Sequence, residues 1–154
     1  MRAILLIGLL AYGCSSDPDP DFAALQQRGE QAMGVNQYTS THTFDDLEDG
    51  GRIELQRDDR DIRDIETIRS HLKTVVVAFA QGNFDVPGFV HAREVPGTRV
   101  MAQKKAVIRY RFSELPKGGE IRITTSDAEA LRAIHEFLAF QRKDHRAAGH
   151  VHSN

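Results

Sequence analysis

FDDLEDGGRIEL, residues 44–55, and FSELPKGGEIRI, residues 112–123, align without a gap and form two versions of one pattern. Five of the twelve positions are identical: the Phe, the Leu, both Gly residues and one Ile. Apolar and polar residues alternate around each Gly-Gly pair, which is typical of two half-buried strands joined by a tight turn. We therefore expect two β-hairpins, with Gly50-Gly51 and Gly118-Gly119 supplying the turns.

A helix of matching phase is expected after each hairpin. Residues 61–79 and 126–145 both carry apolar residues at spacings of three and four, the mark of an amphipathic helix. Ser126 suits the N-cap of the second helix, with Glu129 completing a capping box. With two extra residues allowed in the first copy, the stripe Ile65, Ile68 and Leu72 falls on Leu131, Ile134 and Leu138.

The fold class that follows is α+β: a duplicated β-β-α unit forming a four-stranded antiparallel sheet with two helices on one face. Two unrelated hairpins are the alternative, and they also give an α+β fold. A further short helix is expected from Phe22 to Met33, ended by Gly34. The connection containing Pro87, Gly88, Pro96 and Gly97 is expected to be irregular, and residues 22–145 to form one domain followed by a tail at 146–154.

The N-terminal residues predict export. Met1-Arg2, an apolar run and Gly13-Cys14 have the layout of a signal peptide over residues 1–13, and the run is far shorter than the ~20 residues of a membrane-spanning helix. The segment resembles the lipobox of bacterial lipoproteins, which implies a lipid on Cys14, although Ala11 stands where leucine is usual. Cleavage of the same bond without lipidation is the alternative.

Residues 14–21 are polar and broken by prolines, as in a flexible tether. Ser15 resembles the outer-membrane sorting pattern, so we expect a protein anchored in that membrane and facing the periplasm. Twenty basic residues against twenty-two acidic ones give a net charge of -2 without a basic cluster, which argues against nucleic acid as a partner. One cysteine cannot form an internal disulfide, so the fold must rest on its apolar core.

The histidines are the side chains most suited to form a functional site. The chain has seven histidines, and in an exported protein imidazole with thioether suits copper, whereas imidazole alone suits copper, zinc or haem iron. We expect a non-catalytic protein that binds a metal, copper rather than zinc, or haem. The candidate ligands are His71, His91, Met101 and His135, with His42 and His145 in reserve.

Each histidine also has a structural interpretation. His42 is expected on the same strand face as Phe44, where a hydrogen-bonded core histidine would fit, and His71 and His135 lie at the borders of apolar helix faces. His145 near a helix C-terminus can complement the helix dipole. His150 and His152 belong to the polar tail.

Two other functions stay open. One is a metal-free module of the cell envelope that recognises a protein or a small ligand. The other is a hydrolase that uses His91 with Asp85 and Glu94, but no nucleophile motif or phosphate-binding glycine loop accompanies them, so an enzyme is unsupported.

From Met33 to His145 the chain resembles a family of small bacterial proteins of unknown function. The resemblance is carried by MGVNQ at residues 33–37, THTF at 41–44, IRSHL at 68–72 and IHEFLAFQ at 134–141. It implies that His42, His71, His91, Met101, His135 and His145 are family positions, without implying a reaction. Thr43 departs from the pattern, because relatives often carry a second histidine there.

Overall fold

The structure is a computed structural model that describes residues 19–147. The predicted signal peptide, Cys14, most of the tether, His150 and His152 lie outside the described residues. The elements follow in the order α1 (Pro20–Met33), the 3₁₀ turn η1 (Gln37–Thr39), β1 (Ser40–Leu47), β2 (Gly50–Arg57), α2 (Ile62–Ala80), α3 (Asp85–His91), α4 (Thr98–Gln103), the 3₁₀ turn η2 (Lys105–Val107), β3 (Ile108–Leu115), β4 (Gly118–Thr125) and α5 (Ala128–Asp144). Among these, no helix has the length and apolar character needed to span a membrane.

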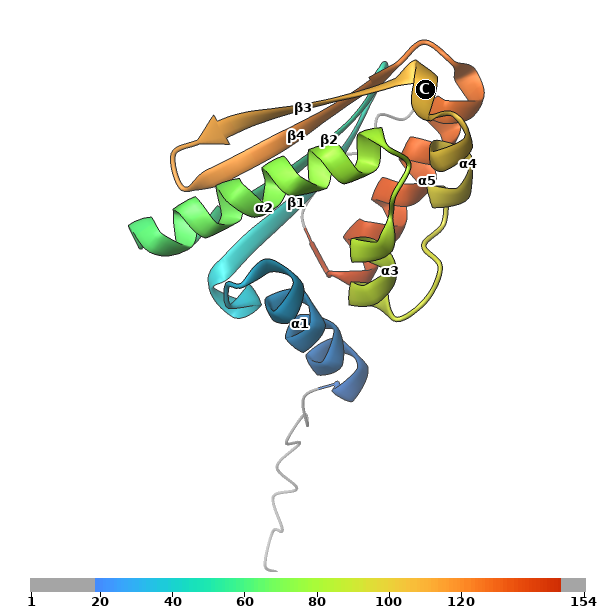
Figure 1. The fold of residues 1–154 in the computed structure, drawn as a ribbon. Helices are drawn as coiled ribbons and strands as arrows, with labels where there is room; N and C mark the ends of the chain where they lie inside the picture. The colour runs from blue at the N-terminus through green and yellow to red at the C-terminus, as the bar shows by residue number, and fades with distance from the viewer. Residues whose placement is uncertain (1–18, 148–154) are drawn as a thin grey trace, which may run out of the picture.

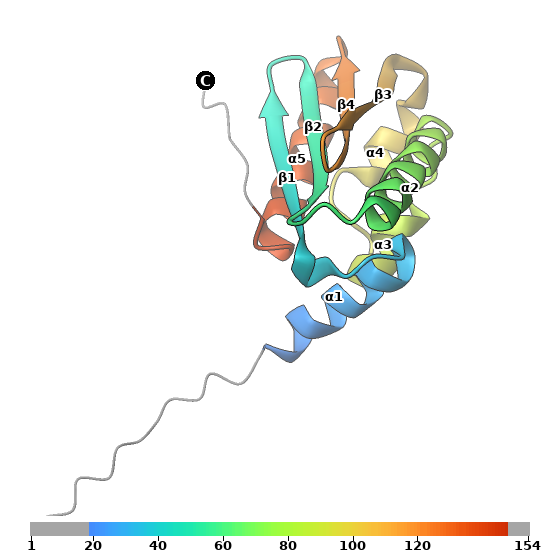
Figure 2. The same ribbon diagram turned by 90° about the vertical axis from the view of Figure 1, so that its left-hand side faces the viewer.

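The four strands form one antiparallel sheet in the order β1-β2-β4-β3, with α2 and α5 on one face (Figure 1). The predicted α+β fold, with two β-β-α units and two helices covering the sheet, is confirmed. Helix α2 packs mainly on β3 and β4, and α5 mainly on β1 and β2 (Figure 2). Each unit's helix therefore covers the hairpin of the other unit, which buries both apolar stripes in a shared core.

The central register reflects the repeat. Ile53 of β2 pairs with Ile121 of β4, which is its counterpart in the alignment of the two copies. On either side Arg52 pairs with Arg122 and Glu54 with Glu120. The alignment of the two copies matches Arg52 with Glu120 and Glu54 with Arg122, so it carries the arginine pair onto the glutamate pair and the isoleucine pair onto itself. The two units therefore meet around an approximate two-fold axis at the isoleucine pair.

The glycine pairs do not form the turns, so that prediction was wrong by two residues. Glu48-Asp49 and Pro116-Lys117 turn the chain, and each Gly-Gly pair begins the following strand. A Cβ on Gly51 would lie 2.2 Å from Leu138 Cδ1 on α5. Gly51 is thus required where a side chain of α5 packs closely against the strand, and the turn itself uses ordinary residues.

Three other boundaries differ from expectation. The N-cap of α5 is Asp127, whose Oδ1 accepts hydrogen bonds from the N–H groups of Glu129 and Ala130 at 2.9 Å each, whereas Ser126 is exposed. The connection predicted to be irregular contains the short helices α3 and α4. Helix α1 begins at Pro20, so the end of the predicted tether is helical; Asp19 caps it.

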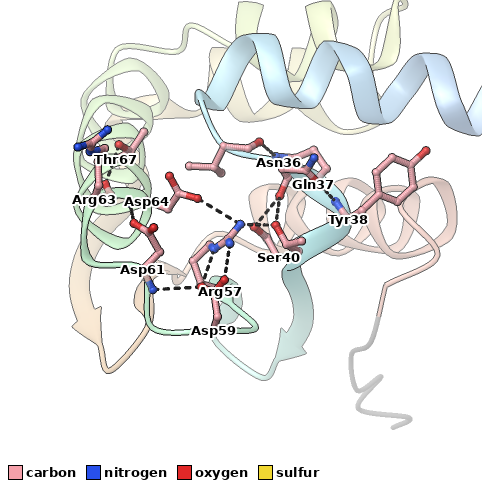
Figure 3. Close-up of polar contacts among 12 residues, drawn as sticks. Asn36, Gln37, Tyr38, Ser40, Arg57, Asp59, Asp61, Arg63, Asp64 and Thr67 are labelled. Atoms are coloured by element: carbon pink, nitrogen blue, oxygen red, sulfur yellow. Dashed lines mark hydrogen bonds and ion pairs between the residues drawn. The ribbon is translucent and has the colours of Figure 1, made fainter.

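A buried arginine fixes the passage from β2 into α2 (Figure 3). The side chain of Arg57 is 7% exposed and donates to Asp59 Oδ2 at 2.7 Å, while Asp64 Oδ2 lies 3.3 Å from its guanidinium. It also donates to the Thr39 hydroxyl in η1. This network ties the start of α2 to the chain that leads from α1 into β1, and so positions the elements around the site described next.

Candidate functional site

Four of the predicted ligands gather at one small cavity. His42, His71, His91 and His145 line it together with Met33, and its volume is about 90 Å³. They come from separate elements: β1, α2, the end of α3, the residue after α5, and the end of α1. We call this cavity the histidine pocket. Apolar side chains of the core complete its wall: Phe44, Ile53, Val75, Phe79, Val86, Pro87, Val90, Ile121 and Phe137.

The imidazole rings contact one another directly. His42 and His145 stack with ring centroids 4.9 Å apart and planes 25° from parallel. His91 meets His145 edge-on at 5.0 Å, and the Phe44 ring lies 5.8 Å from that of His42. The alternation of β1 places His42 and Phe44 on the helix-covered face, as the sequence predicts.

Burial keeps three of the imidazoles at the pocket uncharged, those of His42, His71 and His145. Burial lowers the pKa of His42 to about 4, with a further lowering from His71 nearby. Burial, together with His42 and His91, lowers the pKa of His145 further still. Burial also lowers the pKa of His71. At neutral pH these three rings therefore each present a nitrogen lone pair, the form that binds metals.

Those lone pairs are not used by the fold. Within residues 19–147, the ring nitrogens of His42, His71 and His145 have no hydrogen-bond partner. All three side chains are only partly buried, and none of their nitrogens is among the buried atoms of residues 19–147 that lack a partner, so solvent reaches these nitrogens. His42 packs on Phe44, as its place on the strand predicts, and its ring makes no hydrogen bond to another residue of the range 19–147.

His91 differs, because both of its ring nitrogens have partners. Nδ1 lies 2.5 Å from Asp144 Oδ2, and Nε2 lies 3.0 Å from Gln141 Oε1. The carboxylate beside His91 is thus Asp144, and neither Asp85 nor Glu94 is its partner, which leaves the hydrolase hypothesis without its expected carboxylates.

Met101 and His135 lie away from the pocket. Met101 of α4 is fully buried in the hydrophobic core. Nε2 of His135 contacts the carbonyl oxygens of Leu47 at 3.0 Å and Gly50 at 2.9 Å, which fastens α5 to the β1–β2 turn. Met33 is the methionine at the pocket. The sequence places it at the end of a helix before Gly34, but nothing in that position separates it from Met101 as a candidate ligand.

The donor set limits which ions would fit. In the part of the chain that the structure describes, no three His, Cys, Asp or Glu side chains are arranged to hold a metal ion. The pocket instead offers the unpaired imidazoles of His42 and His145, with His71 and the Met33 thioether beside them. This set contains few donors, and all of them are neutral.

Searches against family models, curated proteins and solved structures found no match to this chain. The interpretation of the pocket therefore depends on its own geometry.

Proposed function

We propose that this protein binds a single copper(I) ion in the histidine pocket, for storage or delivery rather than catalysis. The observation that supports this most is that His42, His71 and His145, all uncharged and without hydrogen-bond partners within residues 19–147, line one cavity together with Met33.

The donor chemistry favours copper(I) over the other candidates. Thioether and imidazole are ligands that copper(I) accepts, and neutral donors in an apolar cavity suit an ion of low charge. Structural zinc sites need four ligands in tetrahedral geometry, which the described residues do not assemble. A cavity of about 90 Å³ is also far below the roughly 300 Å³ or more of sites that hold drug-sized ligands, which argues against haem.

The cellular location belongs to the same proposal. A lipid on Cys14 would place the anchor six residues before the start of α1 at Pro20, so the domain would lie close to the outer membrane on its periplasmic side. The proposed partners are thus the membrane, through the anchor, and a copper ion.

A metal-free binding module is the second candidate, and one observation favours it. The rings of His42, His145 and Phe44 form a stack that would also suit a pocket for a small apolar ligand. In addition, residues 19–147 contain no arrangement of three His, Cys, Asp or Glu side chains that could hold a metal ion. This candidate predicts that copper leaves the thermal stability of the protein unchanged.

The deciding experiment is an anaerobic titration of the mature protein with copper(I) in competition with a coloured chelator. We compare the wild type with the double variant His42→Phe/His145→Phe, which keeps aromatic rings in the stack, and with His135→Gln as the control outside the pocket. Stoichiometric binding in the wild type and control, lost in the double variant, is expected. A wild type that cannot compete for copper(I) would overturn the proposal in favour of the metal-free module.

A further inference from the structure

The two edges of the sheet are not equally covered. β1 and β3 are its outer strands, and the repeat makes them counterparts, with Phe112 of β3 in the place of Phe44. At the β1 edge, Arg142 of α5 donates to the Phe44 carbonyl at 2.8 Å and to both oxygens of the Asp46 carboxylate. Phe44 and Asp46 are buried. A further strand could therefore pair with β1 only by displacing a buried ion pair.

The corresponding edge of β3 lacks this cover. The alignment of the two helices places Val76 of α2 where α5 has Arg142, and valine has no donor. Among residues 19–147, no side chain donates to the Phe112 carbonyl. Phe112 is only partly buried, and the side chain of Glu114, in the place of Asp46, is 54% exposed. The edge of β3 is thus the open edge of the sheet.

The backbone of β3 presents hydrogen-bonding groups at this edge. Leu115 pairs with Gly118 across a two-residue turn, and such a closing pair is hydrogen-bonded. Because only alternate residues of an antiparallel strand bond to the neighbouring strand, the N–H and C=O groups of Tyr110, Phe112 and Glu114 point away from β4. These are the groups to which an added strand would bind.

The sheet face opposite the helices is basic along this edge. Strand alternation places Arg109 and Arg111 there, and both are exposed. Arg111 pairs in register with Arg122 of β4, whose guanidinium contacts Asp49. Arg111 itself has no partner in the described part of the chain, and Arg109 donates to the Ala106 carbonyl. Within residues 19–147, neither arginine of β3 is in an ion pair with a carboxylate.

The helix side of the same edge is apolar. The Phe112 ring lies under Lys73 of α2, whose Nζ is 5.0 Å from the ring centroid. Val77 follows one turn later on the same side of α2 and is 57% exposed. A strand added here would have arginines on one face and apolar side chains on the other.

We propose that the β3 edge binds, as an added strand, an extended peptide in which acidic and apolar residues alternate. Its acidic side chains lie beside Arg109 and Arg111. Its apolar side chains lie beside Phe112 and Val77. A second copy of the chain fits less well, because pairing two β3 strands brings the arginines of both copies to one sheet face. This edge is across the sheet from β1, whose His42 lines the histidine pocket, so the proposal does not depend on copper(I) binding.

The test is the affinity of the mature protein for a fluorescein-labelled peptide of alternating Asp and Val residues, measured by fluorescence anisotropy at about 0.15 M salt. At this ionic strength, exposed charges more than ~8 Å apart are largely screened from each other. A peptide of alternating Lys and Val reverses the charge. A peptide of alternating Asp and Pro keeps the charge, but its prolines cannot donate to a strand.

Two variants address the charge and the backbone of the edge separately. Arg109→Glu/Arg111→Glu reverses the charge. Glu114→Pro removes an outward N–H, which an edge strand tolerates, and it also removes a negative charge, so weaker binding could not be electrostatic. The control is Arg63→Glu/Arg132→Glu, which makes the same change of charge at exposed positions on α2 and α5. Urea unfolding establishes that each variant is folded.

We expect the wild type and the control to bind the Asp-Val peptide with Kd values within about threefold, and each edge variant to bind it at least about tenfold more weakly. The Lys-Val and Asp-Pro peptides should lose at least as much affinity. Equal affinity for the Asp-Pro peptide, an equal loss in the control, or no binding by the wild type would overturn the proposal. A wild-type dimer in sedimentation that Glu114→Pro dissociates would also overturn it, with a second copy as the occupant.

Discussion

His91, at the end of α3, is joined to Asp144, at the end of α5, by a contact of 2.5 Å between Nδ1 and Oδ2. The His91 side chain is 1% exposed, and its other nitrogen faces the Gln141 amide on the same helix. The ring thus fastens the short helix α3, which makes one wall of the histidine pocket, to α5. This contact explains why a histidine in a connecting segment is buried without being a free metal ligand.

Replacing this ring should cost stability. His91→Ala leaves Gln141 and Asp144 without their buried partner and opens a cavity, so we expect the free energy of unfolding to fall by about 2–4 kcal/mol in urea titrations. The control is Arg99→Ala, which breaks an exposed ion pair with Glu94 and should change stability by less than about 1 kcal/mol. A similar small effect for both variants would show that the His91 contact is not holding α3 in place.

The uncharged histidines predict a loss of stability in mild acid. The pKa of His42 and of His145 is lowered in the folded state, so between the ordinary value of 6.5 and the lowered value the unfolded chain binds more protons. Their contribution is fully present above about pH 6.5 and declines as the pH falls toward 4. The pKa values of Asp59 and Asp127 are lowered from 3.8, so protonation of these two carboxylates reduces the stability of the fold only at a lower pH than the histidines do.

Urea unfolding at a series of pH values between 7 and 5, without metal, measures this effect. Each such histidine adds a slope of up to about 1.4 kcal/mol per pH unit. His42→Phe should reduce the slope, since phenylalanine preserves the stack with His145 but does not titrate. Stability that stays level over this range in the wild type would contradict the assignment of neutral rings.

The fold was largely predictable from sequence because its information is local. The repeated pattern around Ile53 and Ile121, and the apolar stripe from Ile65 to Leu72, specify strands and helices through their periodicity. The turns were misplaced because Gly-Gly is a common turn signal, whereas Gly51 is glycine on account of a distant residue, Leu138. Steric contacts of this kind join residues far apart in the sequence, so local sequence patterns do not reveal them.

The site was predictable only in part, for a related reason. The sequence offers His42, His71, His91 and His145 as candidates, and the structure brings all four to one cavity. The sequence cannot distinguish these four from His135 as candidate ligands, since all five are histidines near apolar stripes. The difference arises from the partners that folding supplies, such as the carbonyl groups at the β1–β2 turn for His135.

The ion pair between Arg142 and Asp46 should be a strong link between α5 and β1. Its two side chains are 12% and 6% exposed, and the guanidinium contacts both carboxylate oxygens, at 3.0 and 2.8 Å. Arg142→Met leaves a buried carboxylate without its partner, which typically costs about 3–5 kcal/mol. The double variant Arg142→Met/Asp46→Leu should recover much of that loss, because no unpaired charge remains. Additive losses in a double-mutant cycle would argue against coupling between the two side chains.

Gly97 tests how closely α4 is packed on α5. Its φ of 81° is in the left-handed region, and a Cβ there would lie 2.1 Å from the carbonyl oxygen of Ala133. Gly97→Ala must therefore move α4 or strain its backbone, and we expect a loss of at least about 2 kcal/mol in unfolding free energy.

The matched control for Gly97→Ala is Gly88→Ala in α3. There the nearest atom to an added Cβ is the Arg93 carbonyl oxygen at 3.8 Å, and the backbone is helical without a positive φ. Alanine at this position should be neutral or stabilising by up to about 1 kcal/mol, because glycine is the poorer helix former. Both variants remove the same conformational freedom from the unfolded chain, so their difference reports the steric clash and the backbone strain at Gly97 in the folded state. Equal stability for the two variants would mean that α4 can shift on α5 at little cost. Met101 of α4 would then be packed less tightly than its full burial implies.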